Sequence, residues 1–228
     1  MLHPWDLAPA DARQLQTQLR ERLVLAWDDR PVHTIAGVDV SVPGDTARAA
    51  VVVLRYPELE PLEAVVASVP LVFPYVPGLL SFREAPAILA AWAQLRTQPD
   101  LVMFDGQGIA HPRGLGIAAH LGLWLERPTL GVAKSRLYGR YAEPGPEPGE
   151  TTDLLSQASP PQLIGAVVRT KARSKPLFVS PGHLIDVPHA VGFVLKCVRG
   201  YRLPEPTRWA HRIAGGEQLP PAETPRLF

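Results

Sequence analysis

Cysteine and lysine are both scarce in this sequence, and each shortage narrows the class of protein. The single cysteine, Cys197, excludes an internal disulfide framework and a zinc site built from cysteines, and it is typical of a reducing cytoplasm. Only four of the 23 basic residues are lysine. Arginine binds phosphate in a bidentate manner, so the bias favours a phosphate-bearing partner, although an arginine-rich proteome would produce the same bias.

Signals for secretion, membrane insertion and nucleotide binding are also missing. The N-terminus has no basic region followed by an apolar run. The 19-residue uncharged stretch from Ala64 to Phe82 contains three prolines, which a membrane helix would not normally accommodate. No glycine-rich loop of the Walker type is present, which argues against a phosphotransferase. We therefore expect a cytoplasmic protein with no membrane partner.

Composition and charge indicate one folded domain with a polarised charge distribution. The 228 residues are 46% hydrophobic, and the 26 prolines and 18 glycines follow no repeat, so we expect a single domain over residues 1–228. Residues 1–64 contain ten acidic and six basic residues, whereas residues 165–212 contain nine basic and two acidic ones. A basic stretch of this kind is typical of nucleic-acid binding.

Hydrophobic periodicity predicts an α/β domain, a mixed β-sheet flanked by helices. Its first three strands, separated by turn-rich segments, predict an antiparallel meander. Residues 142–161 are rich in proline and acid and are expected to form a surface excursion, and the tail from Arg202 is expected to be irregular. The predicted helices are 9–25, 82–96, 113–125 and 186–199, and the predicted strands are 33–42, 48–56, 62–69, 101–104, 129–133, 162–169 and 177–180.

Three acidic residues stand out as candidate metal ligands. Asp39 lies inside an apolar strand, where a carboxylate is unfavourable unless it is paired, hydrogen-bonded or bound to metal. Asp105 comes directly after the predicted strand at 101–104, and ligands in α/β folds usually gather at the carboxyl ends of strands. Turn chemistry alone also places aspartate before glycine, which is its structural alternative. Glu84 follows Ser81 at the spacing of a capping box, which is its structural alternative. Three carboxylates would suit Mg²⁺ or Mn²⁺, and such a cluster needs a cation to offset its repulsion.

Several motifs in this chain closely resemble endonuclease V, the family of deoxyinosine-specific DNA repair nucleases. The two most specific are FPYVPGLLSFRE at residues 73–84 and DGQG at 105–108 followed by HPR at 111–113. GVDV at 37–40, GVAKS at 131–135 and RLPEPTR at 202–208 follow the same family order. The resemblance covers nearly the whole chain and implies a ribonuclease-H-like fold and a monomer.

The resemblance implies a metal-dependent reaction at the same three acids. Asp39, Glu84 and Asp105 would bind a divalent ion, normally Mg²⁺ with Mn²⁺ able to substitute. The expected reaction is hydrolysis of the second phosphodiester bond 3′ to deoxyinosine, leaving 3′-OH and 5′-phosphate. Lys134 would offset phosphoryl charge, its alternative being an ordinary solvated lysine. His211 would position water or approach the metal, its alternative being a surface imidazole.

The resemblance also implies how the lesion is recognised. Tyr75, on a loop stiffened by Pro74 and Pro77, would wedge into the base stack, unless it is only a packed turn aromatic. The flipped hypoxanthine would contact Gly78, Leu80, Gly106 and Ile117. His111 would contact the nucleic-acid backbone or serve as a structural loop histidine.

Three questions stay open at this stage. Some relatives prefer inosine in RNA, and no motif here reveals a contact to a 2′-OH. A lesion-binding module without chemistry is a further alternative, although the intact acidic set argues against it. Ser180 to His183 would open a helix whose amides could hold phosphate, or would be a plain proline–glycine helix start.

Overall fold

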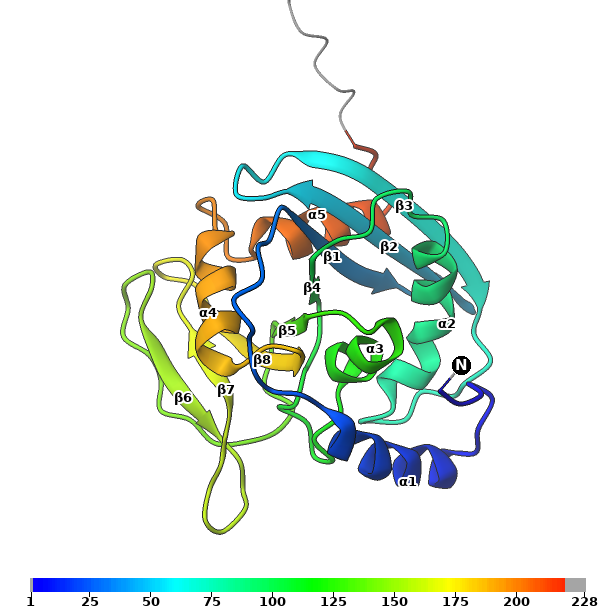
Figure 1. The fold of residues 1–228 in the computed structure, drawn as a ribbon, viewed down its shortest axis with the longest axis horizontal. Helices are drawn as coiled ribbons and strands as arrows, with labels where there is room; N and C mark the ends of the chain where they lie inside the picture. Colours follow the sequence, from blue (N-terminus) through cyan, green and yellow to red (C-terminus); the bar gives the residue numbers. More distant parts are fainter. Residues whose placement is uncertain (1, 220–228) are drawn as a thin grey trace, which may run out of the picture.

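A single eight-stranded mixed sheet runs through the molecule, in the order β3-β2-β1-β4-β5-β8-β7-β6 (Figure 1). This computed structural model describes residues 2–219, so the predicted domain over 1–228 includes Met1 and residues 220–228, which lie outside the described residues. The strands are β1 (Thr34–Ser41), β2 (Thr46–Arg55), β3 (Pro61–Pro70), β4 (Leu101–Phe104), β5 (Thr129–Ala133), β6 (Thr151–Leu155), β7 (Leu163–Val168) and β8 (Leu177–His183).

Strand pairing changes direction twice across the sheet. β1, β2 and β3 form the predicted antiparallel meander, and β5, β8, β7 and β6 are also antiparallel. Between these halves, β1, β4 and β5 run parallel, with Val38 level with Phe104. The carboxyl ends of β1 and β4 therefore lie side by side, and this is where ligands gather in α/β folds.

Helices cover both faces of the sheet. α2 and α3 pack against alanine and valine side chains of β1 and β2 on one face, and α4 and α5 pack on the other, where they bury residues such as Ile35 and Val179. The bounds are α1 (Pro9–Leu19), followed by the 3₁₀ turn η1 (Arg20–Arg22), α2 (Leu80–Trp92), α3 (Ile117–Leu125), α4 (Val187–Lys196) and α5 (Glu205–Ala214). Among the described residues no helix is long and apolar enough to cross a membrane.

The tail that the sequence predicted as irregular contains a helix, and the predicted surface excursion contains a strand. The tail beyond Arg202 contains α5, which that prediction missed because Pro204 and Pro206 suggest a loop, yet proline is tolerated at a helix start. The excursion at 142–161 contains the edge strand β6. The prediction of a helix opening at Ser180 to His183 was also wrong, since these residues complete β8.

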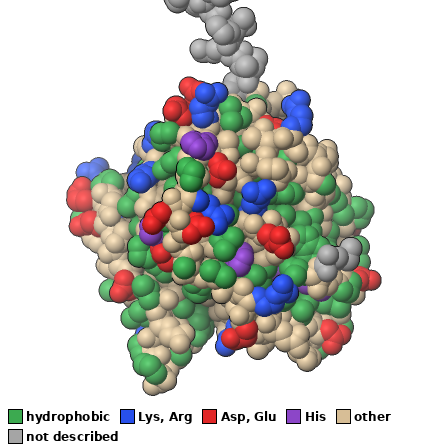
Figure 2. Space-filling model, in the orientation of Figure 1, with side chains coloured by type: hydrophobic (Ala, Val, Ile, Leu, Met, Phe, Trp, Pro, Cys, Tyr) green, Lys and Arg blue, Asp and Glu red, His purple; other side chains and the backbone are tan. Residues whose placement is uncertain are grey.

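Charge is mixed on the surface. The face in Figure 2 carries acidic and basic side chains interspersed with one another, in keeping with a formal net charge of only +1. Attraction of a phosphate-bearing ligand must therefore come from local clusters of basic residues rather than from the overall charge.

Candidate active site

Asp39 and Asp105 lie together at the carboxyl edge of the parallel strands. Asp39 is in β1 and Asp105 directly follows β4, and the amide of Asp105 donates to the Val38 carbonyl at 2.9 Å. Both side chains are only 12% exposed. One Asp39 oxygen accepts the Val40 amide at 2.8 Å. The shared register of two parallel strands thus forces two carboxylates together in a poorly solvated place.

Glu84 brings a third carboxylate from α2, four residues after the helix begins at Leu80. The capping-box interpretation was wrong, because the helix begins at Leu80 and no side chain caps it. The hydroxyl of Ser81 instead lies 2.9 Å from Nδ1 of the buried His120. Burial, together with the negative charges of Asp39 and Asp105, raises the pKa of Glu84 to about 8. That shift places Glu84 in the electrostatic field of both aspartates.

Lys134 and His211 complete the cluster from β5 and α5. The Lys134 Nζ lies 2.5 Å from Asp105 Oδ2 and 3.5 Å from His211 Nδ1. The same His211 nitrogen is 2.6 Å from Asp39 Oδ2. Lys134 is thus ion-paired, and His211, although its side chain is 57% exposed, faces a carboxylate; the roles of both side chains stay predictions. Burial and the charge of Asp105 raise the pKa of Asp39, while its bond to His211 acts in the opposite direction.

The donor set fits a divalent cation. Oxygens of Asp39 and Asp105 and a ring nitrogen of His211 all lie within 4.8 Å of one another. If all three carboxylates ionise, one lysine leaves two uncompensated negative charges, and a divalent ion would balance them and favour loss of the Glu84 proton. Oxygen-rich sites suit Mg²⁺ or Mn²⁺. Glu84 is outside the compact group but close enough to repel it electrostatically.

Beside this cluster, a pocket of about 140 Å³ opens between the 75–80 loop and the start of α3. Six residues that were predicted to bind substrate line it, namely Tyr75, Pro77, Gly78, Leu80, His111 and Ile117. Pro74 does not line this pocket and lies on the other side of the loop. Gly106 is adjacent, because a Cβ there would meet Ile117 Cγ2 at 2.7 Å.

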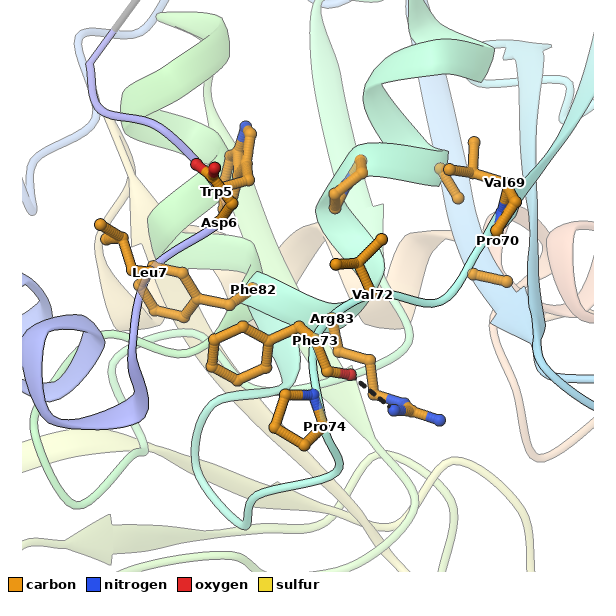
Figure 3. A pocket seen from close by; sticks show the side chains of 13 residues that line it. Trp5, Asp6, Leu7, Val69, Pro70, Val72, Phe73, Pro74, Phe82 and Arg83 are labelled. Atoms are coloured by element: carbon orange, nitrogen blue, oxygen red, sulfur yellow. Dashed lines mark hydrogen bonds between the residues drawn. The ribbon is translucent and has the colours of Figure 1, made fainter.

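Tyr75 is held out into solvent by a loop that is anchored on both sides. Its side chain is 72% exposed, so it is not a packed turn aromatic. Phe73 stacks on Phe82 with ring centroids 5.6 Å apart, and Arg83 donates to the Phe73 carbonyl at 2.7 Å. Figure 3 shows this anchored side of the loop, where Phe73 and Pro74 line a separate, apolar pocket of about 370 Å³.

The other side of the loop is tied down at Gly78. Its carbonyl oxygen lies 2.9 Å from His111 Nε2 and accepts from Arg113 at 2.7 Å and from Gln16 at 3.0 Å. Gly78 has φ +79°, a conformation that favours glycine. Burial and the nearby Arg113 lower the pKa of His111 to about 4, so the ring is neutral at pH 7. His111 therefore has at least the structural role that was its alternative.

Sequence reasoning missed two glutamines at this site. Gln16 of α1 bonds the carbonyls of Gly78 and Leu115, yet nothing in an amphipathic helix marks it out. Gln107 lines the pocket and donates to the Ser135 carbonyl at 3.0 Å, while its buried Oε1 has no partner in the part of the chain that the structure describes. Its place inside DGQG was the available signal. Ser180, expected at a phosphate-binding helix start, accepts the Gly108 amide at 2.8 Å.

Comparison with known proteins identifies relatives along nearly the whole chain. The family model described as Endonuclease V matches residues 16–212. An endonuclease V of Gloeobacter violaceus is 50% identical over 218 residues, which is 93% of this chain and 87% of that protein.

Solved structures agree with this match. The crystal structure of endonuclease V from Streptomyces avermitilis superposes with a TM-score of 0.86 at 40% identity, covering 92% of this chain and 93% of that one. Endonuclease V of Ciona intestinalis, in complex with a 24mer DNA containing an inosine followed by a ribo-adenosine, has a TM-score of 0.79 at 27% identity and covers 90% and 95%. The ribonuclease-H-like fold that the motifs predicted is confirmed.

Proposed function

The chain belongs to the endonuclease V family and is an endonuclease. We propose that it recognises deoxyinosine in DNA and hydrolyses the second phosphodiester bond 3′ to it, leaving 3′-OH and 5′-phosphate. The observation that carries the proposal is the pairing of a cation-binding cluster with an adjacent base-sized pocket. The Ciona intestinalis complex with inosine-containing DNA supports the substrate class.

The acidic residues would hold Mg²⁺, with Mn²⁺ able to substitute. Asp39 and Asp105 offer the nearest oxygens, His211 lies within reach of both, and Glu84 faces them from α2. A bound divalent ion supplies positive charge that polarises the phosphate and lowers the pKa of an attacking water. The two aspartates are fixed by strand register, so little reorganisation would be needed when the substrate binds.

Lys134 and His211 would act on the phosphate and on the water. The ammonium group of Lys134 lies against Asp105 and near His211, where it can offset charge that develops on the phosphoryl oxygens. His211 turns Nδ1 to Asp39 and Lys134, and its Nε2 has no hydrogen-bond partner among residues 2–219, so Nε2 is free to orient a water molecule. In this assignment the carboxylate positions the imidazole, and the imidazole positions the nucleophile.

The pocket beside the cluster would receive the flipped base. Tyr75 is exposed on an anchored loop, so it can insert into a base stack with little loss of conformational freedom. Unstacking a base costs a few kcal/mol, and least for a damaged pair. Gly78 and Gly106 lack side chains, which would allow a base close to the backbone, and Leu80 and Ile117 supply apolar walls.

Strand cleavage of an end-labelled duplex with one deoxyinosine tests the proposal. It would be incubated with Mg²⁺ and with EDTA, beside an undamaged duplex and an inosine-containing RNA of the same sequence. We expect a Mg²⁺-dependent nick one nucleotide beyond the lesion in the damaged duplex.

Each other outcome points to a different function. Cleavage of the RNA alone would assign the same site to an inosine-specific endoribonuclease. Tight binding without cleavage of either substrate would identify a lesion-binding module and would overturn the assignment of the acidic residues to catalysis. Gel filtration of the same preparation would test the expected monomer.

A further inference from the structure

A third cavity, distinct from the base pocket and from the apolar pocket at Phe73, is lined by Lys134. It is an open groove of about 770 Å³ between the chain after β5 and the segment that enters β8. Lys134 lines this groove and also pairs with Asp105 in the cluster. The groove is therefore continuous with the candidate active site, whereas the base pocket lies on the other side of the 134–137 segment, where Leu137 lines it.

The charge lining the groove is positive and largely uncompensated. Arg136 and Lys175 are exposed, and neither forms an ion pair within residues 2–219. The one acid in the lining, Glu143, is already paired with Arg169 at 2.9 Å. Arg136 donates to the Gly139 carbonyl at 3.3 Å, but neither positive charge is neutralised by an acid among the described residues, so both side chains can bind an anion.

The groove is built rigidly. Arg202 donates to the Lys134 carbonyl at 2.8 Å, and also to the carbonyls of Lys175 and Pro176 at 2.7 and 3.0 Å, so one guanidinium joins the two walls. Tyr141 packs edge-on against Phe178 with ring centroids 5.2 Å apart, and the Arg136 guanidinium lies 5.7 Å from the Tyr141 ring centre. A fixed wall, free cations and an aromatic ring are the elements of a single-strand binding surface.

Resting on the function proposed above, we propose that this groove holds the nucleic-acid backbone that flanks the cleaved bond. Arg136 and Lys175 would each bind one phosphate, and Tyr141 would lie against a base or sugar. Because Lys134 lines the groove and also pairs with Asp105, a strand bound in the groove would lie directly beside the acidic cluster. Salt-dependent affinity for long substrates, beyond what the lesion itself provides, is the expected consequence.

This inference is tested by the affinity for a labelled deoxyinosine duplex in EDTA. Fluorescence anisotropy would measure that affinity over a range of salt concentrations. The double variant Arg136→Gln/Lys175→Gln would be compared with Arg55→Gln/Lys196→Gln, which removes the same charges at exposed positions outside the groove. We expect the groove variant to lower the slope of log K against log salt by about 2 and to weaken binding roughly 10- to 50-fold at about 0.1 M salt. The control should bind as the parent does.

Duplexes shortened on the 5′ or the 3′ side of the lesion identify which flank lies in the groove. Shortening the flank that lies in the groove should lower the affinity of the parent protein for the duplex as much as the double substitution does. The affinity of the double variant should not change further. Equal loss in both double variants, or an unchanged salt slope, would overturn the inference. If the parent protein still cleaves deoxyinosine DNA, only the groove inference is refuted and the proposed function is retained. If the parent protein does not cleave this DNA, the proposed function itself is refuted.

Discussion

Five side chains from five separate parts of the chain meet at the candidate active site, and each depends on its neighbours. Asp105 pairs with Lys134, Asp39 with His211, and Glu84 lies in the field of both aspartates. Removing one member therefore alters both the charge and the orientation of the rest. Substitution effects within this group should not be additive.

Asp39→Asn should abolish cleavage without preventing folding. The amide keeps the size of the carboxylate but removes the charge that a divalent ion needs, so we expect single-turnover cleavage to fall by about 10³-fold or more. Affinity for the deoxyinosine duplex in EDTA should stay within a few fold. Asp153→Asn, an exposed aspartate in β6, is the matched control and should cleave normally. Cleavage by Asp39→Asn within tenfold of the parent would show that Asp39 is not a metal ligand.

Tyr75→Ala should weaken recognition of the lesion in duplex DNA. The wedge would contribute part of the few kcal/mol needed to unstack a base, so we expect cleavage of the duplex to fall by about tenfold or more and cleavage of single-stranded DNA to change less. Val72→Ala, 85% exposed on the same loop, serves as control. An equal loss on both substrates would indicate that Tyr75 stacks on the base rather than opening the duplex.

At the scale of elements, α5 decides whether His211 reaches Asp39. The helix packs on β1 and β2, and Ser41 and Arg48 donate to the carbonyl of Ala214 at 2.6 and 2.7 Å. Its start approaches β1 so closely that a Cβ on Gly37 would lie 1.8 Å from the Pro206 carbonyl oxygen. Glycine in the GVDV motif is thus explained by close backbone contact.

Gly37→Ala should disturb both stability and the site. Because the clash is with backbone, α5 would have to move, and we expect the free energy of unfolding to fall by about 3 kcal/mol or more, measured by chemical denaturation. The folded fraction should also cleave more slowly, since His211 moves with the helix. Gly192→Ala in α4, where a Cβ would meet nothing within 4 Å, should be neutral or slightly stabilising. Equal stability of the two variants would contradict this account of the packing.

At the scale of the whole molecule, the fold joins segments of opposite charge. The acidic N-terminal part supplies β1 and the basic C-terminal part supplies α5, and the two pack together beside the cluster. Stability also depends on buried polar groups. His120 lies 2.7 Å from His3 and 2.9 Å from Ser81, and burial, with a smaller effect of the His3 charge, lowers the pKa of His120 to about 3.

His120 should make the protein less stable in acid. In the unfolded chain its pKa is near 6.5, so between about pH 6.5 and 3 the unfolded state binds a proton that the folded state does not. The free energy of unfolding should therefore fall with decreasing pH by up to about 1.4 kcal/mol per unit from this group. Glu84, whose pKa is raised, acts in the opposite sense, so the parent must be compared with a variant.

His120→Gln isolates this effect. The stability advantage of the parent over His120→Gln should shrink as the pH falls from 7 to 5, as measured by urea unfolding at each pH. The exposed His33→Gln is the matched histidine control. A constant difference between parent and His120→Gln across this range would show that His120 is not buried in its neutral form.

The amino-acid sequence was enough to predict the family, the mixed sheet and the five charged or titratable side chains of the cluster, but not the two glutamines beside it. Apolar periodicity locates strands, and a carboxylate within an apolar strand stands out because burial of a charge is unfavourable without a partner. Motif resemblance supplied Lys134, His211 and the Tyr75 loop, and their catalytic and binding roles stay predictions.

Which side chains contact one another could be read only from the three-dimensional packing. Glu84 serves no cap because a packed helix start and the Ser81–His120 contact replaced the local capping bond. α5 forms despite its prolines because its apolar face is buried on β1 and β2. Contacts of Gln16 with Gly78 and of Arg202 with Lys134 join residues 62 and 68 positions apart. Local sequence patterns do not encode such distances, since these contacts depend on how the sheet and helices pack.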